Sequence, residues 1–261
     1  MKALEVKSLS KRFGGLMAVD DLSFSVAKGK VHSVIGPNGA GKTTLINLIT
    51  GMYVPTSGSV LLGMSEITGR PPHKLPALGM TRTFQNLQVC MNMGAVENVM
   101  VGAHLRQNTS LIAGLLSLPS LRTADKLCRA QALEKMAEVG LASYATAQAS
   151  QMPYGALKRL EIARALMTQP QLVLMDEPAA GLNPTETAEV GQLIRRLADQ
   201  GVTVLLVEHD MPLVMGISDT ITVLDHGKTL AEGTPAQVRA NPAVVAAYLG
   251  AEVDAPAEAS P

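Results

Sequence analysis

The stretch Gly36-Pro37-Asn38-Gly39-Ala40-Gly41-Lys42-Thr43 decides the fold class of this 261-residue chain. It matches the pattern G-x-x-x-x-G-K-[ST], and its setting also fits, because an apolar strand (31–35) precedes it and a helix (44–50) is expected after it. Glycines let the backbone wrap closely enough for successive N–H groups to point at phosphate oxygens, and a helix N-terminus adds positive potential. The stretch therefore predicts a phosphate-binding loop for a nucleotide.

The residues of this loop have distinct expected roles. We expect Lys42 to reach the β- and γ-phosphates and Thr43 to give its hydroxyl to Mg²⁺. One alternative is a chance Gly-rich turn; another is a dinucleotide fingerprint, but no third glycine follows Gly39 and Gly41 at the needed spacing. The predicted nucleotide contacts in this region are Gly36, Pro37, Asn38, Gly39, Ala40, Gly41, Lys42, Thr43 and Thr44.

Two carboxylates end another apolar run, at 172–175. Asp176 can hold the metal, usually through water. Glu177 points to the opposite side of the strand, where it can polarise a water for in-line attack on the γ-phosphate. A surface acidic pair is the alternative, which is disfavoured because a buried strand rarely ends in paired carboxylates by chance. We predict Asp176 as a metal ligand and Glu177 as the catalytic base.

Besides the strand at 31–35, nearly continuous apolar runs at 172–175 and 202–207 are typical of strands buried on both faces, which favours a parallel sheet covered by helices. A helix start is predicted at 183–186, with Asn183 as its cap. Between about 86 and 168 the pattern becomes helical, which indicates a helical insertion in an α/β core. Its expected apolar faces are Leu127, Ala130, Leu133, Ala137 and Leu141, and Leu157, Leu160, Ala163 and Met167.

Composition narrows the function classes. The chain has 22 basic and 22 acidic residues and no formal net charge, so a nucleic-acid partner is not expected. Cys90 and Cys128 cannot form a disulfide framework, and we expect both to be buried thiols in a reducing cytoplasm. The start of the chain lacks the apolar block of a signal peptide, and no stretch reaches 18 uninterrupted apolar residues, so no membrane span is expected.

Four further elements, in the same order along the chain, make it resemble the ATPases of ABC transporters. Phe13 resembles the aromatic residue that stacks on adenine. Gln85 matches the glutamine that joins the two subdomains and senses Mg²⁺ and water, so it is implied in both metal binding and catalysis. His209, which follows a predicted strand, matches the switch histidine that contacts the γ-phosphate.

The fourth element is Met152-Pro153-Tyr154-Gly155-Ala156, which aligns with the family signature L-S-G-G-Q. Only Gly155 is identical. Pro153 replaces the usual serine and has neither a hydroxyl nor an N–H to donate. The resemblance implies that this helix start covers ATP, through backbone donors, at Pro153, Tyr154 and Gly155.

Several segments look more specifically like the ATPases of branched-chain (hydrophobic) amino acid importers. They are Tyr-Gly in the signature, Leu-Glu-Ile-Ala-Arg at 160–164, Ala-Ala-Gly-Leu-Asn-Pro at 179–184, Val-Glu-His-Asp-Met at 207–211, and the segments 83–86, 107–123 and 241–250. The resemblance runs from Leu4 to Gly250.

The resemblance implies an α/β fold with a P-loop NTPase core, a mostly parallel sheet, an N-terminal antiparallel β portion and an inserted helical subdomain. The core would comprise 1–85 and 169–250 and the subdomain 86–168, with a disordered tail at 251–261. ATP and Mg²⁺ would be the cofactors. The implied partners are a second cassette, in a head-to-tail homo- or heterodimer, permease subunits docking around 85–97, and indirectly a periplasmic binding protein. The implied location is peripheral, at the cytoplasmic face of the inner membrane.

Two other functions remain open at this stage. One is the ATPase of an exporter for lipid or lipopolysaccharide, which uses the same kind of ATPase domain. The other is a soluble ABC ATPase acting on nucleic acid or ribosomes, which usually needs paired cassettes or long coiled-coil insertions. This chain has one phosphate loop, no sustained heptads and no basic bias. This sequence does not identify the transported solute, because the permease and the binding protein select it.

Overall fold

In the computed structural model, residues 1–106 and 119–253 are described. They divide into two compact units, which we call unit 1 (Met1–Leu75 and the chain from Ile194 onward) and unit 2 (Pro76–Leu193). The boundary between Leu193 and Ile194 falls inside one helix, α6 (Pro184–Asp199). The division inferred from sequence has other borders and stays a prediction.

Unit 1 begins with an antiparallel sheet, as the family resemblance implies. Its strand order is β2 (Leu16–Ala27), β1 (Lys2–Phe13), β4 (Ser57–Leu62) and β5 (Ser65–Glu66). Apolar residues alternate with polar ones along β1 and β2, so that one face of the sheet is buried and the other is polar. The buried face is lined by residues such as Leu4, Val6, Leu22 and Phe24.

The second sheet region of unit 1 holds the strand that leads into the phosphate loop. This strand, β3 (Val31–Ile35), is buried at every position and runs parallel to β8 (Thr203–Val207) and β9 (Thr220–Asp225). The strand β10 (Lys228–Gly233) pairs antiparallel with β9. Burial on both faces explains the apolar run in β8.

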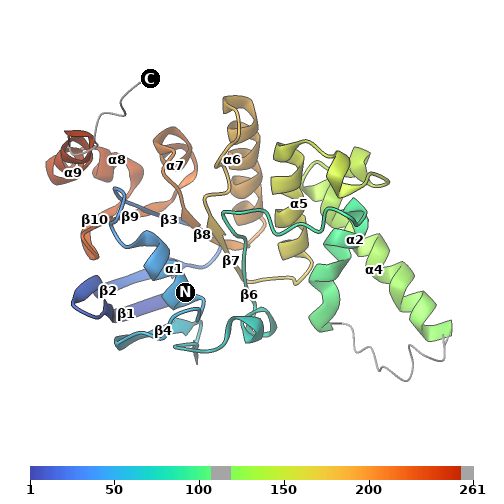
Figure 1. Cartoon of the computed structure of the whole chain (residues 1–261), viewed down its shortest axis with the longest axis horizontal. Coiled ribbons are helices and arrows are strands. Elements are labelled where there is room, and N and C mark those ends of the chain that lie inside the picture. The colour runs from blue at the N-terminus through green and yellow to red at the C-terminus, as the bar shows by residue number, and fades with distance from the viewer. Residues whose placement is uncertain (107–118, 254–261) are drawn as a thin grey trace. The chain divides into compact units, whose positions relative to one another are not determined.

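Four helices accompany these strands: α1 (Lys42–Ile49), α7 (Met211–Ile217), α8 (Pro235–Arg239) and α9 (Pro242–Val253). Figure 1 shows α7, α8 and α9 gathered beside β9 and β10. The helix α1 starts two residues before the expected position, directly at Lys42. The helix α9 runs to Val253, and residues 254–261 lie outside the described part, so the disordered tail expected at 251–261 stays a prediction.

Unit 2 is mainly helical. Besides the first part of α6, it contains α2 (Ala95–Met100), α4 (Pro119–Glu138) and α5 (Tyr154–Leu166), and these three pack on one another (Figure 1). Short 3₁₀ turns lie at Pro76–Leu78, Val101–Arg106, Ala142–Tyr144 and Ala149–Gln151. The strands β6 (Met80–Arg82) and β7 (Leu172–Asp176) pair in parallel.

The expected apolar face of α5 is confirmed, but that of α4 is wrong. Leu127 and Leu133 are 62% and 38% exposed, whereas Cys128, Ala132, Met136 and Val139 form the buried stripe. The stripe expected from the sequence followed the leucines. A neighbouring stripe, which contains the smaller Cys128 and Ala132, has a similar helical period and is the buried one in a helix that packs on α2 and α5. Leu141 of the predicted set is buried in the turn after the helix.

Cys128 is buried as expected, but Cys90 is exposed, so that prediction is wrong for Cys90. Most of the segment 107–123, one of those that resemble the ATPases of branched-chain amino acid importers, lies outside the described residues. Among the described residues, no helix is long and apolar enough to cross a bilayer.

Candidate functional site

The phosphate loop connects β3 to α1 in unit 1, and two of its glycines, Gly36 and Gly41, are required by close backbone approach. A Cβ on Gly36 would overlap the carbonyl oxygen of Leu224, and one on Gly41 would lie 2.6 Å from the carbonyl oxygen of Ala18. Gly41 also has a φ of 100°, in the left-handed region, and it caps the N-terminus of α1. The loop is therefore wedged against two neighbouring strands with its N–H groups at a helix start.

Lys42 is the first residue of α1, and its side chain folds back over the loop. Its Nζ donates to the carbonyl oxygens of Gly36 at 2.7 Å and Pro37 at 3.0 Å. Thr43 and Thr44 occupy the first turn of α1, and Thr43 is exposed. This places an ammonium group and a hydroxyl beside the exposed positions Asn38 and Gly39, as phosphate and metal binding require.

Phe13 ends β1 in unit 1 and is 42% exposed. Its ring packs edge-on against Tyr53, with centroids 5.3 Å apart, and the ammonium of Lys11 lies 5.0 Å from its centroid. A core phenylalanine would be buried, so the exposed ring fits a stacking surface. Sequence reasoning did not identify Tyr53, which fixes the tilt of this ring.

His209 lies two residues after the end of β8, just beyond a buried strand as predicted. Its side chain is 65% exposed, and its Nδ1 lies 3.8 Å from Oε2 of Glu208, whose carboxylate is fully buried. The same Oε2 accepts from the backbone N–H of His209 at 3.1 Å. The next residue, Asp210, caps α7 by accepting from the N–H of Leu213. The histidine is thus an exposed ring on a backbone that a buried glutamate and a helix cap hold in place.

In unit 2 the carboxylate of Asp176 ends β7 and is nearly buried. Arg82, the last residue of the neighbouring strand β6, donates to Asp176 Oδ2 at 2.8 Å, and both side chains are only about one-tenth exposed. The pairing is charge-assisted and in a partly buried setting, so it fixes the carboxylate. It uses one carboxylate oxygen and leaves the other for a metal or a metal-bound water.

Glu177 follows with a φ of 48°, a left-handed conformation that is uncommon for residues with a side chain. This turn re-aims the carboxylate after the strand ends. Gln85 Nε2 donates to Glu177 Oε2 at 2.6 Å, so the structure brings together two residues that are 92 positions apart in the chain. Backbone strain at such a position is typical of functional sites.

The signature segment starts α5. Pro153 is its N-cap, with a ψ of 154°, and no side chain caps the helix. Tyr154 is 46% exposed, and its ring lies over Gly181. A Cβ on Gly155 would lie 2.5 Å from Oε1 of Glu186, a residue of the first turn of α6. A side chain at position 155 would therefore have to displace the carboxylate end of Glu186 inside unit 2.

The predicted capping of α6 is confirmed. Glu186 N–H donates to Asn183 Oδ1 at 2.9 Å, and Asn183 N–H donates to Glu186 Oε2 at 3.0 Å. This reciprocal pair is a capping box. Asn183, at a position where the family often has aspartate, thus performs a structural task that either residue type can perform.

The predicted site residues fall into two groups. Unit 1 carries Phe13, the loop 36–44 and His209, and unit 2 carries Gln85, Asp176, Glu177 and the signature start 153–155. Within unit 2, Gln85 and Glu177 are in contact. That both groups serve one reaction is a proposal, taken up below.

Comparison with known proteins gives the family. Residues 19–180 match the model of the family described as ABC transporter. The chain belongs to the ABC transporter family. Residues 228–254 of this cassette also match the model described as branched-chain amino acid ATP-binding cassette transporter.

Curated relatives match this cassette over nearly its whole length. It is 49% identical to the high-affinity branched-chain amino acid transport ATP-binding protein BraF of Pseudomonas aeruginosa, over 95% of this chain and 97% of that protein. It is 46% identical, with the same coverage, to the high-affinity branched-chain amino acid transport ATP-binding protein LivG of Escherichia coli. A crystal structure of a nucleotide-free ATP-binding cassette from an ABC transporter superposes with a TM-score of 0.82 at 32% identity, covering 95% of this chain and 99% of that one.

These findings confirm the predicted fold class and the recognition of an ABC ATP-binding cassette of the branched-chain amino acid type. The family's ATPase domain also confirms the prediction that the protein is an ATPase. The residues that carry the individual steps remain predictions.

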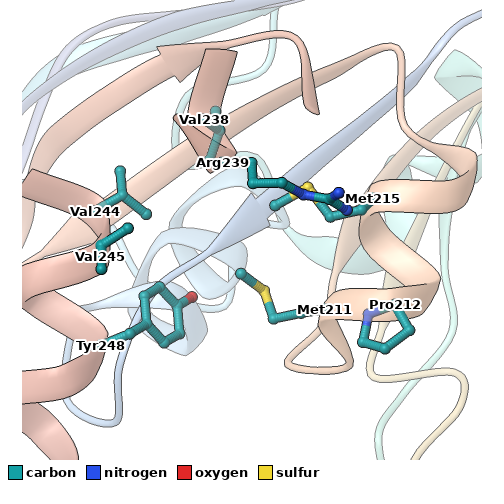
Figure 2. Close-up of a pocket in the computed structure, with 8 residues that line it drawn as sticks. All are labelled: Met211, Pro212, Met215, Val238, Arg239, Val244, Val245 and Tyr248. Atoms are coloured by element: carbon teal, nitrogen blue, oxygen red, sulfur yellow. The ribbon is translucent and has the colours of Figure 1, made fainter. Parts of the chain in front are cut away.

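The C-terminal segment of this cassette, which carries the second family match, borders an open apolar cavity of about 540 Å³ in unit 1. Figure 2 shows side chains of α7 facing those of α8 and α9 across it. The lining residues are Met211, Pro212, Met215, Val238, Arg239, Val244, Val245 and Tyr248. The cavity lies beside the helix that follows His209 and Asp210, and it contains none of the predicted nucleotide contacts.

Tyr248 carries the one hydroxyl on this cavity wall. Burial raises the pKa of Tyr248 to about 12, and the backbone N–H of Gly36 offsets the rise only in part. The oxygen is fully enclosed and lacks a well-formed hydrogen bond to any described residue. The first residue of the phosphate loop thus has a neighbour near the C-terminus of the described chain, which sequence reasoning did not identify.

Sequence reasoning also missed Arg82, Lys158 and Glu161 of this cassette. Lys158 and Glu161 are each 3% exposed and lie on α5. The sequence did contain a signal for Lys158 and Glu161. They directly follow the apolar positions Leu157 and Leu160 on the same helix, so they lie next to its buried face, where charged residues are uncommon.

Proposed function

We propose that this cassette binds ATP with Mg²⁺ in the phosphate loop and hydrolyses it with Glu177 as the general base. Two half-sites carry the proposal. One is the phosphate loop, in which Gly36 and Gly41 allow close backbone packing and Lys42 folds back over the loop. The other is the carboxylate of Glu177, to which Gln85 donates at 2.6 Å. The first supplies phosphate contacts and the second a base aimed by its own partner.

Each residue then has a chemical role. The loop N–H groups and Lys42 bind the β- and γ-phosphates, and the exposed ring of Phe13 stacks on adenine. Thr43, Asp176 and Gln85 would hold Mg²⁺, which neutralises charge on the phosphates when it is bound. Glu177 orients and deprotonates the attacking water, and His209 contacts the γ-phosphate as a hydrogen-bond donor.

The second part of the proposal is a head-to-tail pair of cassettes. The helix start at Pro153, Tyr154 and Gly155 would cover the nucleotide held by the partner, through backbone donors. ATP drives closure only by binding the closed pair more tightly than the open one. Whether the partner is a second copy or a related cassette is set by the transporter.

The third part is the transport task. The relatives named above are described as branched-chain amino acid transport proteins, and on that basis we assign this cassette to the import of branched-chain or other hydrophobic amino acids. It would bind, as a peripheral protein at the cytoplasmic face, to permease subunits in the inner membrane through the region 85–97. A periplasmic binding protein would act through the permease only.

The test of the first part is Lys42→Ala. Loss of the charge-assisted contacts is expected to weaken ATP binding by about a hundredfold. Lys28→Ala, which removes an exposed lysine of unit 1, is the matched control and should bind like the wild type. A folded Lys42→Ala protein with wild-type ATP affinity in calorimetry would refute the loop assignment.

The transport task is tested in proteoliposomes that contain permease subunits and binding protein from the same gene neighbourhood. We expect ATP-dependent uptake of leucine, isoleucine or valine that the Lys42→Ala cassette does not support. ATP-dependent uptake of an unrelated solute, or export, would overturn the assignment to amino acid import.

A further inference from the structure

Three charged side chains of α5 bind the backbone of the segment 84–88, which we call the glutamine loop. Lys158 Nζ donates to the carbonyl oxygen of Gln85 at 2.8 Å. Glu161 Oε1 accepts from the N–H of Phe84 at 3.2 Å. Arg164 donates to the carbonyl oxygen of Gln88 and lies 3.6 Å from Glu161. Residues three apart lie on one side of a helix, so α5 presents a continuous polar edge to this loop.

Burial makes this arrangement unusual. Lys158 and Glu161 are each 3% exposed, whereas Phe84, Gln85 and Gln88 are exposed. Charged groups are seldom buried unless hydrogen bonds and opposite charges compensate them. Here the compensation comes from the loop's own N–H and C=O groups. An exposed segment without regular structure is thus anchored by buried charges on a helix.

Burial and several neighbouring groups act in opposite directions on the pKa of Glu161. Burial raises its pKa, and this rise is opposed by the N–H of Phe84, by the charges of Arg164 and Lys158, and by the N–H of Gln88. The carboxylate and the loop backbone therefore satisfy each other. Removing the loop from its place would leave Glu161 without two of its partners.

The two ends of this contact carry parts of the candidate site. At one end the side chain of Gln85 donates to Glu177 at 2.6 Å. At the other end Lys158 lies 5.7 Å from the ring centroid of Tyr154, in the first turn of α5. A single lysine thus contacts the signature residue and the backbone of the residue that holds the proposed base.

We propose that Lys158 and Glu161 are positioning residues that clamp the glutamine loop to the signature helix, so that Gln85 and the start of α5 move as one body. The inference rests on the proposed function, because the clamp affects ATP hydrolysis only if Gln85 and the start of α5 take part in it. The position of the base partner Gln85 would then follow the position of the signature start. The clamp acts through Gln85 and touches neither nucleotide nor metal.

Amide hydrogen exchange of the full-length, nucleotide-free protein tests the clamp directly. Lys158→Met is expected to raise exchange in the peptide covering 82–90 by about tenfold, the factor typical for one hydrogen bond to a charged group. Exchange in α1 should stay unchanged. Lys158→Arg retains a donor and a charge and should restore most of the protection. Arg159→Gln is the matched control, because Arg159 is the next residue of α5 but pairs with Glu189.

Turnover supplies the second readout. In Lys158→Met we expect kcat to fall about tenfold while the ATP affinity stays within about twofold, because the phosphate loop is untouched. Lys158→Arg should regain turnover, and Arg159→Gln should retain it. If Lys158→Met does not fold, Lys158→Gln replaces it, since its shorter uncharged side chain loses the contact without leaving an apolar end.

The outcomes separate the clamp from the proposed function. Wild-type exchange at 82–90 and wild-type kcat in a folded Lys158→Met or Lys158→Gln protein would overturn the clamp. Increased exchange that spreads equally to α1 would also overturn it, because the lysine would then act on general stability. A wild-type protein that fails to bind ATP would instead refute the proposed function. The exchange experiment would still test the contact between Lys158 and the glutamine loop, because it uses nucleotide-free protein.

Discussion

The two half-sites are built in different ways. In unit 1 the phosphate loop is a backbone device: its shape follows from two glycines pressed against the carbonyls of Leu224 and Ala18, and its binding groups are mostly N–H groups. In unit 2 the site is a side-chain device. Asp176, Glu177 and Gln85 are each held by another side chain or by an unusual backbone angle.

This difference decides what a sequence motif can encode. A backbone device needs only residues that allow the backbone path, so it appears as glycines at fixed spacing. A side-chain device can recruit its supports from any segment that folds nearby. The supports of unit 2, such as Arg82 and Lys158, are 94 and 73 positions away from the groups they hold. Unit 2 can therefore tolerate an altered signature if its supports are kept.

The largest effect is expected at the base of unit 2. Glu177→Gln keeps an acceptor for Gln85 but removes the carboxylate that takes the proton. We expect kcat to fall by about a thousandfold, within the range for loss of a general base, while ATP affinity changes little. Single-turnover kinetics and calorimetry measure the two quantities.

The matched control for this variant is Glu134→Gln, which alters an exposed glutamate of α4 in the same unit. It should turn over at the wild-type rate. If Glu177→Gln lost ATP affinity as strongly as turnover, the two half-sites would not divide binding from chemistry, and the comparison would fail.

The sequence predicted the buried strands and the phosphate loop well for a physical reason. Apolar runs locate β7 and β8, and the glycine pattern locates the loop between β3 and α1. Helix α4 was found by its period, but its buried face was misassigned, because Leu127 and Leu133 are exposed and the smaller Ala132 faces the neighbouring helices. Which of two adjacent stripes is buried depends on the packing partner, and that is not encoded locally. The role of Gly155 beside Glu186 depends in the same way on a distant helix.

A second prediction concerns stability beneath the phosphate loop. His32, in β3, is buried against the ring of Phe24 and lies 2.8 Å from the hydroxyl of Thr222, and burial lowers the pKa of His32 to about 4. The unfolded chain takes up a proton near pH 6.5, whereas the folded protein does so only near pH 4. Stability is therefore fully present above pH 6.5 and declines as the pH falls toward 4, by up to about 3 kcal/mol.

The measurement is urea unfolding between pH 7 and 4, for the wild type and for His32→Leu. The variant should lose this part of the pH dependence, although it also loses the contact with Thr222. In unit 2 the sign is opposite, because a buried carboxyl with a raised pKa, Glu161, binds its proton more readily in the folded protein. Equal pH dependence in both proteins would show that His32 is not the group responsible.

A third prediction separates two reasons for Gly155. If the carboxylate of Glu186 must shift to admit a Cβ, Gly155→Ala should destabilise the protein by about 1 kcal/mol, at the low end of the range for overpacking a rigid core. Truncating Glu186 in the same protein should recover part of that loss, after allowance for the capping box that Glu186→Ala removes. A double-mutant cycle in urea gives the coupling energy between the two positions.

The same four proteins test the role of Gly155 as a cover for the partner's nucleotide. If backbone approach to phosphate matters, ATPase activity stays low in Gly155→Ala even when Glu186→Ala restores stability. Recovery of activity together with stability would leave packing as the only role of this glycine. Either result tells whether unit 2, like unit 1, also binds phosphate through its backbone.

The smallest effect is expected at Tyr248, whose hydroxyl is enclosed beside Gly36 without a well-formed hydrogen bond to a described residue. Replacing an unsatisfied buried polar group by an apolar one of similar shape costs little or is slightly stabilising, so Tyr248→Phe should change the free energy of unfolding by less than about 1 kcal/mol. ATP affinity should stay within about twofold, because the loop is held by its own backbone contacts. Tyr248→Ala, which removes the ring from the cavity wall, should cost about 3 kcal/mol and confirms that the ring is packed. A tenfold loss of ATP affinity in Tyr248→Phe would mean that a side chain from α9 positions Gly36, and the phosphate loop would then be, in part, a side-chain device like unit 2.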